Sequence, residues 1–272
     1  MPETPPAIDS LLGDVPRLGP DDTFQFACRQ DLDCFTRCCH DVSIVLTPYD
    51  VLRLKNALGI SSSELLARHT ISPVAGDQPV PVVLLRMDPE TKRCPFVCES
   101  GCRVYRDRPW ACRMYPLGLA EPQRATLAGT PFHFLVREDL CQGHAVPQQC
   151  SVREWIVQQG IEEYDANNAS FTALMLDGFW DRKASLTQAQ LDMLFMAWYD
   201  LDRFRRFVLE TSFLARFDVD ETRVEAMRTD EAELLEFAMQ WVRFCVLGQK
   251  TMRVKPTVVA AAADNRANRA SV

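Results

Sequence analysis

Apolar residues in the second half of the chain recur at three- and four-residue steps, the spacing of one face of an α-helix. A capping box of Thr187 and Gln190 predicts the start of one long helix. The apolar face of this helix is formed by Leu191, Leu194, Trp198, Leu201 and Val208.

Two further helices are predicted in the same part of the chain. Ser151 and Glu154 form a second capping box, which opens a helix through Gln159. A last helix repeats the apolar pattern at Leu234, Leu235, Ala238, Trp241, Val242 and Cys245. We therefore expect residues 151–250 to form a helical domain.

The first half of the chain has a weaker helical pattern. Thr47 is a good N-cap and is followed by Pro48, a residue suited to the first helical position. The predicted helix ends at Gly59 and buries Val51, Leu52, Leu54 and Leu58. Ser61 opens a shorter helix through Ala67.

Short β-like runs cover 80–85 and 132–136, and the remaining sequence predicts loops. The expected fold is mainly α with small β elements. Changes in composition and apolar periodicity along the chain predict four segments: a disordered leader (1–20), a cysteine-rich domain (21–150), a helical domain (151–250) and a disordered tail (251–272).

Charge and targeting signals limit which partners and which cellular compartment are expected. The formal net charge of −7 gives no attraction to nucleic acid or to anionic lipid, so neither partner is expected. The N-terminal sequence has no basic and apolar signal pattern, and no apolar run is long enough to span a bilayer. These features predict a cytoplasmic protein.

Cysteine is concentrated in the first half of the chain, where ten of the eleven cysteines lie between Cys28 and Cys150. Thiols stay mostly reduced in the cytosol, so such density favours metal or redox chemistry over disulfides. Thiolates are soft ligands that suit zinc, copper(I) and iron–sulfur clusters. We expect an irregular, metal-organised cysteine-rich domain; a secreted disulfide scaffold is the alternative.

The cysteine spacing excludes several common motifs. Cys34-x3-Cys38-Cys39 lacks the Cys-x2-Cys pairs of zinc ribbons, and Asp41 stands where a radical-SAM motif needs its third cysteine. Bacterial ferredoxin spacing is absent as well. The sequence also contains no GxGxxG, GxxxxGK[ST], HExxH or GxSxG motif, so it carries no nucleotide-binding or hydrolase signature.

A more specific pattern combines the first cysteine cluster with a later block. Leu46, Thr47 and Asp50 follow that cluster, and the later block runs from Cys94 through Gly101-Cys102 and Arg103–Pro109 to Cys112-Arg113 and Tyr115-Pro116. Residues 24–143 thereby resemble the bacterial CxxCxxCC-type family, a zinc- or iron-chelating domain often labelled iron–sulfur cluster-containing protein. Flagellin lysine methylases carry a similar cysteine block.

The resemblance implies eight metal ligands when its pattern is carried over position by position. They are Cys28, Cys34, Cys38, Cys39, Cys94, Cys102, Cys112 and Cys141. Eight thiolates suffice for two four-coordinate sites or two clusters. The spacing before Cys34 departs from the family pattern, and Cys98 is an extra thiol.

Other residues near these cysteines have more ordinary interpretations. His144 is expected in a surface loop, although it could complete a site. Cys150 adjoins a helix start as a stabilised thiolate or a buried thiol, and Cys245 is expected in the core.

Six arginines of the cysteine-rich segments could offset thiolate charge: Arg37, Arg93, Arg103, Arg106, Arg108 and Arg113. Pro109 and Pro116 are expected to hold Cys112 in an extended conformation.

The function predicted from these features is metal binding, with iron–sulfur clusters preferred and zinc as the alternative cofactor. Two other functions stay open at this stage: a cluster-dependent protein-modifying enzyme, and a zinc-stabilised interaction module. A protein partner is compatible with each of them.

Overall fold

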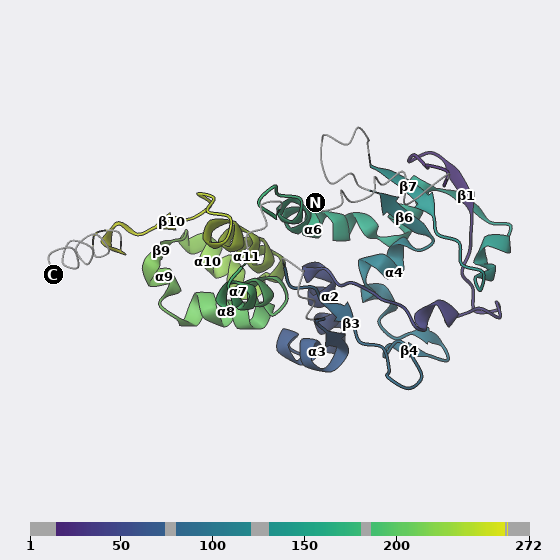
Figure 1. The fold of residues 1–272 in the computed structure, drawn as a ribbon, viewed down its shortest axis with the longest axis horizontal. Coiled ribbons are helices and arrows are strands. Elements are labelled where there is room, and N and C mark those ends of the chain that lie inside the picture. Colours follow the sequence, from purple (N-terminus) through teal and green to yellow (C-terminus); the bar gives the residue numbers. More distant parts are fainter. Residues whose placement is uncertain (1–14, 74–79, 121–130, 181–185, 259, 261–272) are drawn as a thin grey trace, which may run out of the picture. The chain divides into compact units, whose positions relative to one another are not determined.

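The computed structural model describes residues 15–73, 80–120, 131–180, 186–258 and 260 (Figure 1). The chain divides into two compact units, each built from separate stretches of sequence. Unit 1 comprises Met1–Leu46 and Leu84–Ala166, and unit 2 comprises Thr47–Val83 and Asn167–Val272. The sequence-based boundary at residue 150 was drawn from cysteine content and stays a prediction.

The secondary structure confirms a mainly α fold with small β elements. Within the described residues, no helix combines the length and the apolar character needed to cross a membrane. Of the predicted leader, residues 1–14 lie outside the described part, and Leu18 forms an antiparallel bridge with His133. Of the predicted tail, 259 and 261–272 lie outside it.

Unit 1 contains short strands, single turns of 3₁₀ helix and short α-helices. Its strands are β1 (Thr23–Gln25), β3 (Leu84–Leu85), β4 (Val97–Cys98), β5 (Gly101–Cys102), β6 (Leu117–Ala120), β7 (Phe132–Leu135) and β8 (Gln149–Ser151). Its helical elements are η1 (Arg37–Cys39), η2 (Tyr105–Asp107), α4 (Trp110–Met114), η3 (Gln142–Ala145), α5 (Val152–Gln159) and the start of α6 (Ile161–Met175). The pairs β1–β8, β4–β5 and β6–β7 are antiparallel.

An apolar core supports the cysteine-rich unit. Trp155 packs edge-on against Phe24 and Phe26, with ring centroids 5.9 and 5.5 Å apart. The core also contains Met114, Leu117, Cys150, Val152 and Ile161. The cysteine-rich sequence predicts loops organised by metal in this region. These residues show that apolar packing contributes as well, because buried aromatic pairs are strongly stabilising.

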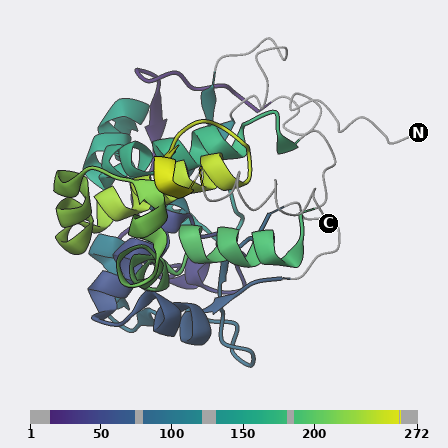
Figure 2. The ribbon, with the colours of Figure 1, turned by 90° about the vertical axis from the view of Figure 1, so that its left-hand side faces the viewer.

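Unit 2 is a helical assembly. Its helices are α2 (Pro48–Leu58), α3 (Ser62–His69), the end of α6, α7 (Gln188–Trp198), α8 (Leu201–Glu210), α9 (Phe213–Arg216), α10 (Glu221–Thr229) and α11 (Glu231–Cys245). Three short strands complete it: β2 (Thr70–Ile71), β9 (Phe217–Asp218) and β10 (Arg253–Val254). Helix α11 packs against α7, α8 and α10, and these green and yellow helices lie together in both views (Figures 1 and 2).

The helix starts follow the predicted caps. Thr47 and Ser151 each cap a helix through a complete capping box, and the helix opened by Thr47 ends at Gly59 with a positive φ of 65°. The single long helix predicted after Thr187 is wrong, because it breaks at Tyr199 and Asp200 into α7 and α8. Of the β-like run 80–85, only Leu84–Leu85 is a strand.

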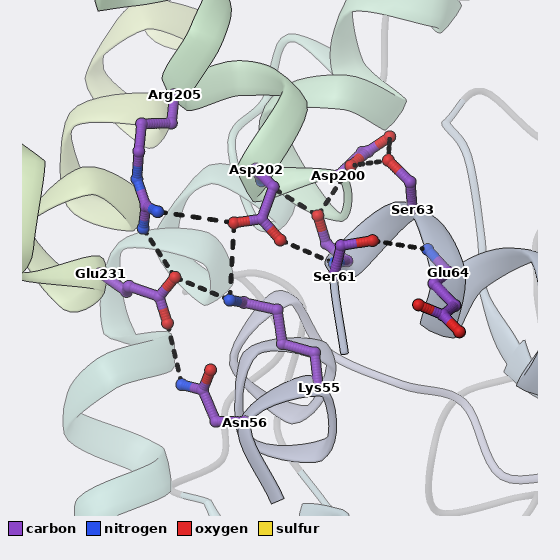
Figure 3. Close-up of polar contacts among 10 residues, drawn as sticks. Lys55, Asn56, Ser61, Ser63, Glu64, Asp200, Asp202, Arg205 and Glu231 are labelled. Carbon is purple, nitrogen blue, oxygen red and sulfur yellow. Dashed lines mark hydrogen bonds and ion pairs between the residues drawn. The ribbon is translucent and has the colours of Figure 1, made fainter. Parts of the chain in front are cut away.

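A charged network holds α2 and α3 to α8 and α11 within unit 2 (Figure 3). Lys55 Nζ lies 2.7 Å from Glu231 Oε1 and 3.5 Å from Asp202 Oδ1. Arg205 pairs with the same two carboxylates, and Asn56 Nδ2 donates to Glu231 Oε2. Lys55 is only 6% exposed, so its charge depends on these partners.

The N-termini of α3 and α8 cap one another beside this network. The backbone N–H of Ser62 donates to Asp202 Oδ2, and the backbone N–H of Asp202 donates to Ser62 Oγ. Ser62 Oγ also donates to Asp200 Oδ1 at 2.7 Å. Each helix thus satisfies backbone donors of the other, which fixes the 47–83 segment on the C-terminal helices.

Candidate metal centre

The first cysteine cluster is wound into a compact turn. Thr36 adopts a left-handed φ of 64° and precedes η1, which carries Cys38 and Cys39. The backbone N–H of Arg37 donates to the Cys34 carbonyl at 2.9 Å. This turn brings three thiol-bearing residues together within a few residues of sequence.

Cys94 and Cys102 belong to a hairpin that joins this turn. The Cys94 N–H donates to the Cys39 carbonyl at 2.8 Å, and Val97 pairs with Cys102 across β4 and β5. Gly101 has a φ of 115°, and a Cβ there would lie 3.2 Å from the Phe35 ring. Glycine therefore suits this tight hairpin, because any side chain would be strained in that conformation.

Cys112 lies on α4, so the expected extended conformation is wrong. Pro109 is the N-cap of this short helix, and Pro116 follows its C-cap residue. The two prolines thus delimit a helical turn, since proline is tolerated at a helix start and cannot continue a helix. Cys112 is exposed on that turn.

Cys141 is brought to the first cluster by η3. The backbone N–H of Gln142 donates to Cys34 Sγ at 3.3 Å, and the Ala27 N–H donates to the Gly143 carbonyl at 3.1 Å. A Cβ at position 143 would lie only 2.6 Å from the Phe26 ring and 2.9 Å from the Ala27 carbonyl oxygen. The absence of a side chain at Gly143 permits this close approach.

Electrostatic effects show which thiols are neighbours. Partial burial, followed by the thiols of Cys38, Cys34 and Cys141, raises the pKa of Cys28 to about 11. We call Cys28, Cys34, Cys38 and Cys141 the first thiol group. Cys141 lies more than a hundred residues after the other three members in the sequence.

The other four predicted ligands form a second neighbourhood. A hydrogen bond to Cys38 and burial raise the pKa of the Cys39 thiol, and the thiols of Cys94 and Cys112 add to this effect. Burial raises the pKa of Cys94, and the Cys102 thiol contributes in the same direction. We call Cys39, Cys94, Cys102 and Cys112 the second thiol group.

The pKa values of the adjacent thiols Cys38 and Cys39 are shifted in opposite directions. The hydrogen bond from Cys39 lowers the pKa of Cys38 to about 7, whereas the same hydrogen bond makes Cys39 harder to deprotonate. The lowered pKa favours the thiolate of Cys38, the form that binds metals and attacks electrophiles.

Arg108 lies near both thiol groups. Burial lowers the pKa of this 8% exposed guanidinium, and the Cys112 and Cys102 thiols act in the opposite direction. Its charge also acts on Cys28. Arg108 is anchored by donating to the Tyr105 carbonyl at 2.6 Å and to the Gln159 side chain. Its charge thus acts on thiols of both groups, whereas its hydrogen bonds go to Tyr105 and Gln159.

Arg113 has a different role from the one predicted. Its guanidinium donates to the backbone carbonyls of Arg106, Arg108 and Gln159 and to the Tyr164 hydroxyl. The guanidinium also lies over the Tyr164 ring, 4.3 Å from its centroid. Arg113 therefore ties α4, and with it Cys112, to α5 and α6.

Two polar side chains, those of His144 and Tyr115, are buried close to Cys141. Both ring nitrogens of His144 are inaccessible to solvent, which differs from the expected surface loop. The Tyr115 hydroxyl is also buried; burial and a hydrogen bond with the Cys141 thiol raise its pKa. Both rings pack on Phe26, with centroid distances of 5.1 and 5.7 Å. Sequence reasoning did not identify Tyr115 individually, although it lies in the quoted Tyr115-Pro116 motif.

The three remaining cysteines, Cys98, Cys150 and Cys245, belong to neither thiol group. Cys98 lies in the β4–β5 hairpin, where Ser100 Oγ is 3.2 Å from its sulfur. Cys150 is buried in β8 opposite Phe24, and burial raises its pKa, which favours the buried-thiol interpretation. The Cys245 thiol donates to the Trp241 carbonyl at 2.9 Å within unit 2.

The thiols are gathered in one unit but do not form a finished coordination shell. None of the eleven cysteines, all within the described residues, forms a disulfide. No three His, Cys, Asp or Glu side chains in the described ranges converge closely enough to hold a metal ion. A bound ion would have to draw the sulfur atoms inward, as expected where metal binding and folding are coupled.

Comparison with known proteins gives one family. Residues 27–151 match the CxxCxxCC model, described as "Putative zinc- or iron-chelating domain". Searches of curated proteins and of solved structures gave no match. The matched range includes all eight predicted ligands and both thiol groups. This match confirms the resemblance deduced from the cysteine pattern, and residues 27–151 of this chain are similar to the CxxCxxCC family.

Proposed function

We propose that the protein is a metal-binding protein that holds iron–sulfur clusters through its eight predicted cysteine ligands, with zinc as the alternative metal. The coarser part of this function rests on the family, whose description is a zinc- or iron-chelating domain. The observation that carries the proposal is the gathering of the eight thiols of 28–141 in unit 1, where the Cys94 N–H donates to the Cys39 carbonyl and the Gln142 N–H donates to Cys34 Sγ.

The donor set fits a soft metal. All eight predicted ligands are thiols, and thiolate sulfur is the preferred donor of iron–sulfur clusters and of structural zinc. The ring nitrogens of His144 add buried polar atoms without a hydrogen-bond partner three residues after Cys141. Buried polar groups normally have partners, so these atoms are consistent with a ligand at this place.

The cysteines and Arg108 have different roles toward the metal. The cysteines supply the sulfur atoms, and each thiol releases its proton to solvent when it becomes a ligand. Arg108 offsets part of the thiolate charge, and its anchoring to Gln159 keeps that charge in place. A bound iron–sulfur cluster would supply one-electron redox chemistry, whereas zinc would supply folding energy.

The test is purification without oxygen, followed by a visible spectrum and assays of iron, zinc and acid-labile sulfide. Brown protein with stoichiometric iron and sulfide would support clusters, and colourless protein with stoichiometric zinc would support the alternative. Protein without stoichiometric metal of either kind would contradict the proposal. Cys245→Ser is a matched control, because Cys245 lies in unit 2 and should leave the metal content unchanged.

A further inference from the structure

An open cleft lies beside α8 in unit 2. Its volume is about 460 Å³, and it is lined by Met196, Arg203, Arg206, Phe207, Glu210 and Thr211. Met196 belongs to α7, and the other lining residues belong to α8 or follow it directly. None of them takes part in the candidate metal centre, whose thiols lie in unit 1.

The sequence of α8 explains why arginines face this cleft. Leu201, Phe204 and Val208 are buried, which is the three- and four-residue spacing of an amphipathic helix. Arg203 and Arg206 are exposed and three residues apart. Side chains at this spacing are neighbours on a helix surface, so two guanidinium groups stand side by side at the cleft.

These two arginines have no acidic partner. Arg205, which lies between them in the sequence, is paired with two carboxylates of the charged network (Figure 3). Within the part of the chain that the structure describes, the side chains of Arg203 and Arg206 form neither an ion pair nor a hydrogen bond. Even with the Glu210 carboxylate, the cleft has a formal charge of +1, whereas the whole chain has a net charge of −7.

The cleft also has an apolar part. Phe207 is half-buried, and its ring packs on Phe213 and Trp241 with centroid distances of 5.3 and 5.9 Å, so its position is fixed. Met196 is half-buried as well, and its flexible thioether can adapt to a partner. Aromatic residues, methionine and arginine are enriched in protein interfaces, and four of the six lining residues are of these types.

We propose that this cleft docks an acidic segment of a partner protein. Two carboxylates of that segment, about one helical turn apart, bind Arg203 and Arg206, and a bulky apolar side chain next to them packs on Met196 and Phe207. Charge complementarity selects the acidic class, because the planar fork of a guanidinium matches a carboxylate. This docking requires neither a metal nor a thiol, so it is independent of the proposed metal binding.

The negative net charge favours a short peptide segment over other anions. Nucleic acid and anionic membranes are extended polyanions, which the whole chain repels over a long range. A short acidic segment carries few charges and interacts mainly with the local arginines. The apolar part of the cleft adds contacts that a small inorganic anion does not use.

The first test selects peptides from a displayed random library on the immobilised full-length protein. Binders to the double variant Arg203→Glu/Arg206→Glu are removed beforehand. The enriched sequences should combine two acidic residues with a bulky apolar residue. Absence of enrichment, or enrichment of peptides without acidic residues, would overturn the proposal.

The second test measures the affinity of one enriched peptide by fluorescence anisotropy. Arg203→Gln/Arg206→Gln should weaken binding about tenfold or more, because charge-assisted hydrogen bonds are lost. Met196→Gln should weaken it several-fold, since an amide replaces an apolar contact. The matched control Arg216→Gln/Arg228→Gln removes the same charge from exposed arginines outside the cleft and should change affinity less than about twofold. Equal weakening by both double variants would show unspecific attraction and overturn the proposal.

The third test separates the peptide from other anionic partners. Vesicles of phosphatidylglycerol and polyuridylate should bind the wild-type protein more weakly than the enriched peptide. Tighter binding of either, lost in Arg203→Gln/Arg206→Gln, would assign the cleft to that partner instead. All the substituted side chains except Met196 are exposed, so urea unfolding should show the double variants as stable as wild type.

Discussion

Lys55 Nζ lies 2.7 Å from Glu231 Oε1, an ion pair that joins residues 176 positions apart. The pair is mostly buried, and Asp202 and Arg205 extend it into a network of two cations and two carboxylates (Figure 3). Because α2 and α11 are distant in sequence, this network is one of the main links that unite the two stretches of unit 2.

Removal of the Lys55 charge should destabilise unit 2. Lys55→Met leaves Glu231 and Asp202 with Arg205 as their remaining cation, and breaking a buried pair costs about 3 kcal/mol. The measurement is the free energy of unfolding in urea. Arg68→Met is the control, because its pair with Glu64 is exposed and should change stability by less than about 1 kcal/mol. Equal effects of the two variants would show that the network does not stabilise the unit.

The same network predicts loss of stability in acid. Desolvation acts to raise the pKa of Glu231, but hydrogen bonds from Lys55, Asn56 and Arg205 outweigh it and hold that pKa below its usual 4.5. A carboxylate with a lowered folded pKa stabilises the protein above its unfolded pKa, and this stabilisation is lost as pH falls through the folded pKa.

Glu231→Gln should therefore reduce the free energy of unfolding at neutral pH. The difference from wild type should be constant above about pH 5.5 and shrink as pH falls below the ordinary pKa of 4.5. Urea unfolding at a series of pH values measures it. A difference that grows in acid would mean that the sign of the pKa shift is wrong.

Arg113 should not be replaceable by lysine. Arg113→Lys removes the planar fork that serves three backbone carbonyls, and leaving even one buried acceptor unsatisfied costs about 1–3 kcal/mol. We expect a lower unfolding free energy of the metal-free protein. Arg106→Lys is the matched control, because the Arg106 side chain is exposed and only its backbone carbonyl takes part. Equal stability of both variants would contradict the anchoring role.

Cys98 should be a reactive thiol that does not bind metal. The hydrogen bond with Ser100 lowers the pKa of Cys98, so iodoacetamide should alkylate it at lower pH than an ordinary thiol. Ser100→Ala should move the pH profile of alkylation upward. Cys98→Ser should retain full metal content, and loss of metal would identify Cys98 as a ligand instead.

Local sequence signals predicted much of the fold. Thr47, Ser151 and Thr187 are each followed by a helix, because a side-chain cap and its partner three residues later act within one turn. The break between α7 and α8 was missed because the apolar spacing continues across it. Asp200, which lies at the break, binds Ser62 and Ser63 from the other stretch of unit 2, and no local pattern shows such a contact.

The candidate metal ligands were predictable in composition but not in arrangement. The eight cysteines follow from the family pattern, whereas their neighbours depend on contacts such as those of Cys94 with Cys39 and Gln142 with Cys34. The roles of Arg108 and Arg113 could not be separated either. Both are buried arginines in one motif, and only the fold shows which of them acts on thiols and which serves carbonyls.

The interleaved order of the cysteines affects biosynthesis. Cys28, Cys34, Cys38 and Cys39 leave the ribosome early, yet the first thiol group is incomplete until Cys141 has been made and the second until Cys112 has been made. In between, the ribosome produces α2 and α3, whose charged partners on α8 and α11 come later still. A nascent chain therefore exposes Cys28, Cys34 and Cys38 without Cys141 for roughly the time needed to add a hundred residues, about 5–20 seconds at 5–20 residues per second.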